Sequence, residues 1–148
     1  MDFFEEVDLD RAQAEAIARG LFAVAKCDGL HEREAALIAS FWLDSGGGAD
    51  ALSSLERGAT IRPDELAAAL PSPAQRQLFL KTAILLTYAD GKVTAEERQC
   101  VREFAGGLGI DENAVDALDQ SVKDFLMQHL AHLQNVDAAV AIAKKLEV

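Results

Sequence analysis

The chain has 148 residues, of which half are hydrophobic and 26% are charged. This is the composition of one globular domain, and it argues against a disordered or fibrous protein. The formal net charge of −11 repels phosphate backbones and anionic membrane surfaces, so neither nucleic acid nor a membrane is an expected partner. The chain contains two cysteines but no Cys-x-x-Cys motif, which argues against a disulfide framework or a structural zinc site.

The beginning of the chain and its most apolar run bear on where the protein is found. The first six residues contain no basic segment, which predicts that the chain has no signal peptide. The run from 78 to 89 is interrupted by Lys81 and is shorter than the roughly 20 residues that a membrane span needs. We therefore expect a single cytoplasmic domain over residues 1–148, with no membrane insertion.

Helical spacing of apolar residues predicts four helices in the first half of the chain. The first runs from about Asp8, its predicted N-cap, to Cys27. The second begins just after His31, and the next two span 49–57 and 63–70. The apolar face of the second helix carries Leu37, Ile38, Phe41 and Trp42.

Three further helices are predicted in the second half. Residues 72–75, Ser-Pro-Ala-Gln, form a helix start with a Ser N-cap, and the helix over 73–89 is hydrophobic nearly all round. Such a helix belongs at the centre of a fold. A capping box at 94–97 opens the next helix, and Asp111 caps the last, whose apolar spacing continues to 146. No segment alternates like a strand, so we predict an all-α bundle of about seven helices.

An internal repeat relates the two halves of the chain. A shift of 62 residues aligns 21–29 with 83–91 and places Glu34 on Glu96. Each copy reads as a buried helix, an Asp-Gly turn and an acidic start of a second helix. The sequence therefore predicts two pseudo-repeated helix-turn-helix units around the buried central helix.

The acidic residues at these turns suggest a cation site. Asp28 and Asp90 each end a helix, where the helix dipole is already negative, and are therefore unfavourable alone. Four more carboxylates follow the turns: Glu32, Glu34, Glu96 and Glu97. An oxygen-only ligand set favours calcium, magnesium or manganese. The EF-hand pattern is absent from both turns.

Helix capping explains the same residues without an ion. Gly29 and Gly91 are ordinary C-cap residues, and Thr94 with Glu97 forms an ordinary capping box. An Asp between two helices can also accept hydrogen bonds from the amides that open the second helix. The sequence leaves both explanations open.

The two turn segments, Lys26-Cys-Asp-Gly-Leu-His-Glu-Arg-Glu34 and Tyr88-Ala-Asp-Gly-Lys-Val-Thr-Ala-Glu-Glu97, resemble the signature turns of the tellurite-resistance TerB-like family. That family also supplies the N-terminal domain of DjlA-type co-chaperones. The resemblance covers about residues 10–146, and the second segment matches the pattern A-D-G-x-[aliphatic]-[ST]-x-x-E. It implies an all-α fold and a bacterial stress or tellurite response that acts through protein partners.

The resemblance also implies a ligand set, because metal binding by the acidic turns has been proposed for the family. The residues that match its pattern are Asp28, Glu34, Asp90 and Glu97. The first turn departs from the pattern, with His31 in the usual aliphatic place and Ala35 opposite Glu97. This departure weakens a two-fold symmetric site.

Two hypotheses for function follow. The first is a non-enzymatic domain that uses its acidic turns to hold a divalent cation or to dock a protein. The alternative is a purely structural interaction module without metal, either co-chaperone-like or self-associating. We predict no enzymatic activity, because the chain lacks a nucleophile elbow and a P-loop, and His129 and His132 do not form an HExxH motif. Cys27 and Cys100 are predicted to be buried packing thiols.

Overall fold

The computed structural model describes residues 9–29, 32–58, 60–88 and 94–131. Within these residues the chain forms seven α-helices, one short 3-10 helix and no strand, which confirms the predicted all-α fold. The elements are α1 (Arg11–Ala25), η1 (Lys26–Asp28), α2 (Glu32–Asp44), α3 (Ala49–Arg57), α4 (Pro63–Ala69), α5 (Pro73–Thr87), α6 (Ala95–Gly107) and α7 (Glu112–Ala131). No helix in this part of the chain is long and apolar enough to cross a membrane.

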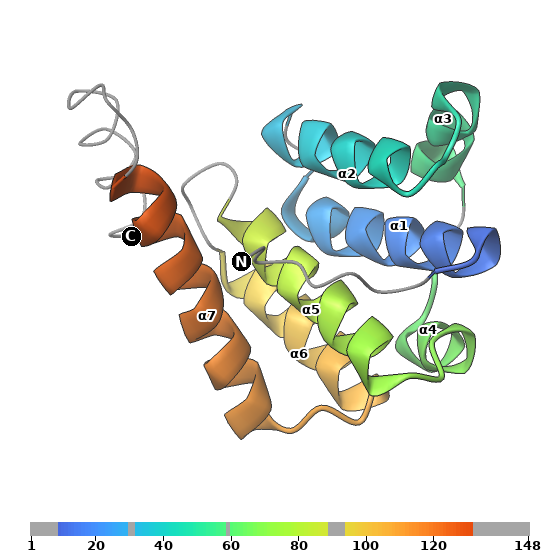
Figure 1. Cartoon of the computed structure of the whole chain (residues 1–148). Coiled ribbons are helices and arrows are strands. Elements are labelled where there is room, and N and C mark those ends of the chain that lie inside the picture. Colours follow the sequence, from blue (N-terminus) through green and yellow to red (C-terminus); the bar gives the residue numbers. More distant parts are fainter. Residues whose placement is uncertain (1–8, 30–31, 59, 89–93, 132–148) are drawn as a thin grey trace.

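Two helices share the centre of the molecule. α1 packs against α2, α3, α4, α5 and α6, and α5 packs against α1, α2, α6 and α7 (Figure 1). α2 and α3 cover one side of α1, whereas α7 lies against α5 and α6. The helix predicted to be central, α5, therefore holds that place together with α1.

The start and end of α1 differ from the prediction. Asp10 caps the helix: its Oδ1 accepts from the N–H of Gln13 at 2.8 Å, and its own N–H donates to Gln13 Oε1 at 3.0 Å. The predicted cap, Asp8, lies outside the described residues. The α-helix ends at Ala25 because the backbone tightens into η1, so the predicted end at Cys27 is wrong by two residues.

The start of α5 agrees with the prediction and adds a contact between the two central helices. Ser72 caps the helix, with Gln75 completing the capping box. The Gln75 amide donates to Gln13 Oε1 at 3.0 Å, and the Gln13 amide donates to Gln75 Oε1 at 3.3 Å. These two glutamines are 62 residues apart, which is the predicted repeat offset. The repeat itself stays a prediction.

The core is continuous across α1, α5 and α6. Ile17, Leu21 and Phe79 are completely buried, and the rings of Phe79 and Phe104 lie 5.3 Å apart between centroids. Gly20 allows α1 and α5 to approach closely, because a Cβ at this position would lie 2.6 Å from Phe79 Cε1. Phe79 therefore packs at the point where the two central helices meet.

α7 closes the bundle on the side of α5 and α6. Asp111 caps it as predicted, accepting from the N–H of Ala114 at 2.8 Å. Val122 is completely buried, and Val115, Leu118 and Leu126 pack partly buried against the core. The predicted apolar continuation over 132–148 lies outside the described residues.

Candidate functional site

Each of the two acidic helix starts buries one glutamate and exposes another. In the first turn of α2, Glu34 is 0% exposed, whereas Glu32 faces solvent. In the first turn of α6, Glu97 is 0% exposed, whereas Glu96 faces solvent. The predicted offset of 62 residues pairs Glu34 with Glu96, whereas burial pairs it with Glu97, one residue further along the chain. Two carboxyl groups are therefore buried in the protein, where they are unfavourable without compensating interactions.

Hydrogen bonds with Thr94 offset part of the cost of burying Glu97. The Thr94 hydroxyl accepts from the N–H of Glu97 at 3.2 Å, which confirms Thr94 as the N-cap of α6. The same hydroxyl donates to Glu97 Oε1 at 3.3 Å. The buried carboxylate also lies in the first turn of the helix, where the dipole favours negative charge. Helix capping accordingly accounts for one oxygen of Glu97.

The two Asp-Gly turns are described only in part. The backbone of Asp28 belongs to η1, and Gly29 follows it with φ of 99°, a conformation that glycine adopts readily. The side chain of Asp28 and the whole of Asp90 lie outside the described residues. Among the side chains that are described, no group of three or more His, Cys, Asp or Glu could hold a metal ion. The four-residue ligand set stays a prediction.

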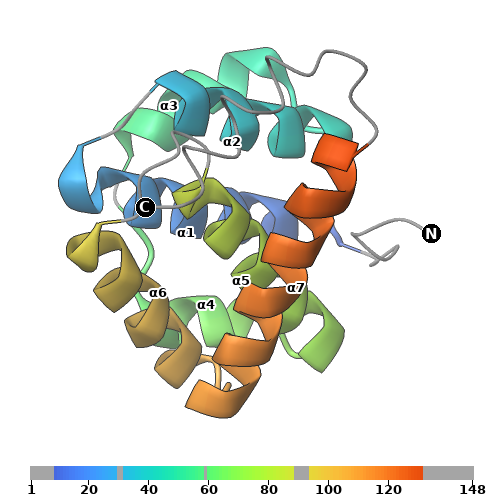
Figure 2. The same cartoon turned by 90° about the vertical axis from the view of Figure 1, so that its left-hand side faces the viewer.

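Two helix contacts link the segments that precede the Asp-Gly turns to the helices that carry the buried glutamates. η1 packs against α6, the helix that carries Glu97, and Figure 2 shows the end of α1 beside the start of α6. In the same way α5, which leads to the second turn, packs against α2, the helix that carries Glu34. The helix before each Asp-Gly turn, or the 3-10 helix at its end, thus packs against the helix that carries the other buried glutamate.

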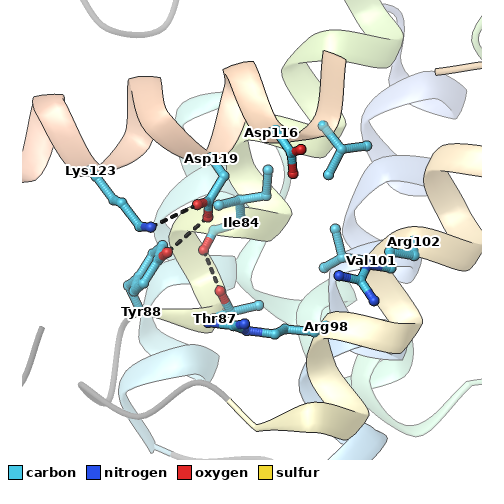
Figure 3. A pocket seen from close by; sticks show the side chains of 10 residues that line it. Ile84, Thr87, Tyr88, Arg98, Val101, Arg102, Asp116, Asp119 and Lys123 are labelled. Atoms are coloured by element: carbon cyan, nitrogen blue, oxygen red, sulfur yellow. Dashed lines mark hydrogen bonds and ion pairs between the residues drawn. The ribbon is translucent and has the colours of Figure 1, made fainter. Parts of the chain in front are cut away.

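A polar pocket of about 150 Å³ lies between α5, α6 and α7 (Figure 3). Its charged and hydrogen-bonding lining comprises Thr87, Tyr88, Arg98, Arg102, Asp116, Asp119 and Lys123. The Tyr88 hydroxyl donates to Asp119 Oδ1 at 2.8 Å, and Lys123 Nζ lies 3.1 Å from Asp119 Oδ2. Burial, followed by the hydrogen bond to Asp119, raises the pKa of Tyr88 above its ordinary value of 10, so the hydroxyl stays protonated at neutral pH.

Sequence reasoning missed this pocket. Arg98 and Arg102 are four residues apart on α6, and Asp116 and Asp119 are three apart on α7, so each pair shares a helix face. That spacing is also typical of a solvent-exposed charged face, and no local signal points from one helix to the other. Only the packing of α7 against α5 brings Asp119 to Tyr88.

The two cysteines lie together, and one of them is not where it was predicted. Cys27 is exposed, because η1 carries it out of the packed face of α1, so the prediction that it is buried is wrong. Cys100 on α6 is partly buried. Cys27 Sγ donates to the carbonyl oxygen of Ala23 at 3.3 Å, and Cys100 Sγ donates to the same oxygen at 3.8 Å.

These features define a small all-α domain with two central helices and two acidic helix starts. A family model described as Tellurite resistance protein TerB matches residues 57–120, from the end of α3 to the first half of α7. The match confirms the resemblance read from the sequence: residues 57–120 are similar to the TerB family. It includes Glu97 and the second turn, whereas Asp28 and Glu34 lie before it. No curated protein and no solved structure matches the chain.

Proposed function

We propose that this chain is a non-enzymatic, tellurite-resistance-associated binding domain that holds a divalent cation with its acidic turns. The ligands are Asp28, Glu34, Asp90 and Glu97, and residues 1–148 act as one domain. The observation that carries the proposal is the complete burial of Glu34 and Glu97 beside exposed acidic neighbours. A buried carboxylate is stabilised most strongly by a positive charge, and oxygen ligands favour calcium, magnesium or manganese.

Two contacts between helices support one shared site. η1, to which Asp28 belongs, packs against α6, the helix of Glu97, and α5, which precedes the second turn, packs against α2, the helix of Glu34. A cation at this place would bridge both units and therefore favour the folded chain over the unfolded one. The competing explanation is that the buried glutamates serve only as caps, as the Thr94 contact does for Glu97.

Thermal melts of the full chain, treated with chelator and then supplied with calcium, magnesium, manganese or zinc, test the proposal. An ion at 100 times its dissociation constant stabilises the folded state by about 2.7 kcal/mol. We expect Glu34→Gln and Glu97→Gln each to abolish that shift. The matched controls are Glu32→Gln and Glu96→Gln, which remove one exposed carboxylate from the same two helix starts and should keep the shift.

Two outcomes contradict cation binding by the buried glutamates. One is a wild-type melt that no ion changes, and the other is an equal ion response from the buried and the exposed variants. An unchanged melt together with self-association in light scattering would favour the metal-free interaction module instead.

A further inference from the structure

The fold brings together the only two cysteines of the chain, which are far apart in sequence. Cys27 lies on η1 and Cys100 on α6, two elements that pack against each other. Their sulfur atoms approach one carbonyl oxygen, that of Ala23, at 3.3 Å and 3.8 Å. The two thiols thus share an acceptor, and they also hydrogen-bond to each other.

The two thiols differ in access to solvent. Cys27 is exposed, whereas Cys100 is partly buried behind it. Burial raises the pKa of the Cys100 thiol, and a hydrogen bond with Cys27 raises it further. Because Cys27 is the more exposed of the two, an oxidant in solution meets Cys27 first. Cys100 stays protonated beside it, because its pKa is raised.

We propose that Cys27 and Cys100 form a reversible oxidation site, which closes to an intramolecular disulfide by exchange with a small disulfide such as oxidised glutathione. In the first step the Cys27 thiolate attacks one glutathione sulfur. A Cys27–glutathione bond forms, the glutathione disulfide bond breaks, and the departing thiolate takes a proton. Cys100 then loses its proton to solvent and attacks Cys27 Sγ, releasing the second glutathione.

Oxidised glutathione supplies the whole oxidation. Two protein thiols are oxidised to one disulfide, and one glutathione disulfide is reduced to two thiols. A disulfide usually has its Cα atoms about 4.4–6.8 Å apart, so the proposal requires the Cα atoms of Cys27 and Cys100 to reach this separation. The disulfide would link the first turn to α6, the helix that Thr94 caps and that carries Glu97. The proposal does not depend on cation binding.

The experiment uses the reduced full chain, incubated with oxidised glutathione, then alkylated and measured as intact mass under denaturing conditions. We expect wild type to lose two hydrogen atoms, to become resistant to alkylation at both cysteines and to remain monomeric. Peptide mapping should link the peptide of Cys27 to that of Cys100. Added dithiothreitol should restore both thiols.

Single variants separate the two steps. Cys100→Ser should stop at a stable glutathione adduct on Cys27, whereas Cys27→Ser should react far more slowly because its remaining thiol is partly buried. Circular dichroism of both variants establishes that they are folded. A wild-type protein that accumulates the Cys27 adduct as Cys100→Ser does, or that forms only intermolecular disulfides, overturns the proposal.

Discussion

The central helices α1 and α5 begin with the same kind of cap, but their C-terminal ends contact different helices. Each begins with a capping box, Asp10 with Gln13 in α1 and Ser72 with Gln75 in α5, and the two glutamines hydrogen-bond to each other. Each also ends in a right-handed helical C-cap residue, Lys26 with φ of −80° and Tyr88 with φ of −91°. The partners of these two C-cap residues, however, belong to different helices.

The difference lies in which outer helix each end contacts. Lys26 donates to the Glu56 carbonyl of α3, whereas the Tyr88 hydroxyl donates to Asp119 of α7. The first end also places the exposed Cys27 next to α6, and the second borders the polar pocket. The comparison indicates that the starts of α1 and α5 are joined to each other, whereas their ends contact different outer helices.

The largest expected effect comes from breaking the centre that both helices share. Phe79→Ala should lower the free energy of unfolding by about 3–5 kcal/mol, because the ring fills the contact between α1 and α5 and leaves a cavity. Ile17→Ala, 62 positions earlier and also completely buried, should cost about 2–5 kcal/mol. Urea denaturation measures both. Leu43→Ala, at a residue that is 51% exposed, is the control and should change little; a Phe79 variant as stable as this control would contradict the shared centre.

A smaller effect is expected at the paired helix starts. Gln13→Ala and Gln75→Ala should each lower the free energy of unfolding by about 1–3 kcal/mol, because each removes a capping-box contact and the reciprocal amide contact. The double variant should lose less than the sum of the two. A double-mutant cycle by urea denaturation measures this coupling. Strictly additive losses would mean that the reciprocal contact does not couple α1 to α5.

The smallest effect is expected at the end of α5. Tyr88→Phe should cost about 0.5–1.5 kcal/mol at neutral pH, because it removes the hydrogen bond to Asp119. The pKa of Tyr88 is raised in the folded state, so its contribution is complete below the unfolded pKa of about 10 and falls as pH rises through the folded pKa. The difference in stability between wild type and Tyr88→Phe should therefore narrow above pH 10.

Two features make this prediction easy to check. Tyr88 is the only tyrosine in the chain, so the tyrosinate absorbance of the folded protein reports this residue alone and should appear above pH 10. Cys100 also has a raised pKa and lowers alkaline stability in the same direction, but it does so equally in both proteins. A tyrosinate transition at pH 10 in the folded state would mean that neither burial nor the hydrogen bond to Asp119 raises the pKa of Tyr88.

The sequence by itself determined the helices and most of their starts. Apolar spacing is a local property of the chain, and an N-cap contact spans only two or three residues, so Ser72, Thr94 and Asp111 could be assigned without the fold. The hydrophobic character of α5 likewise predicted its central place. Of the candidate ligands, the sequence identified the acidic helix starts but not which glutamate in each is buried.

Only the tertiary structure decided how these elements meet. One residue along a helix turns a side chain by about 100°, so the packing of α2 and α6 determines that Glu34 and Glu97 are buried while Glu32 and Glu96 are exposed. The tightening of α1 into η1 exposes Cys27, and the docking of α6 and α7 brings Cys100 to Cys27 and Asp119 to Tyr88. These contacts join residues that are distant in sequence, and their free energy depends on packing that no local pattern encodes.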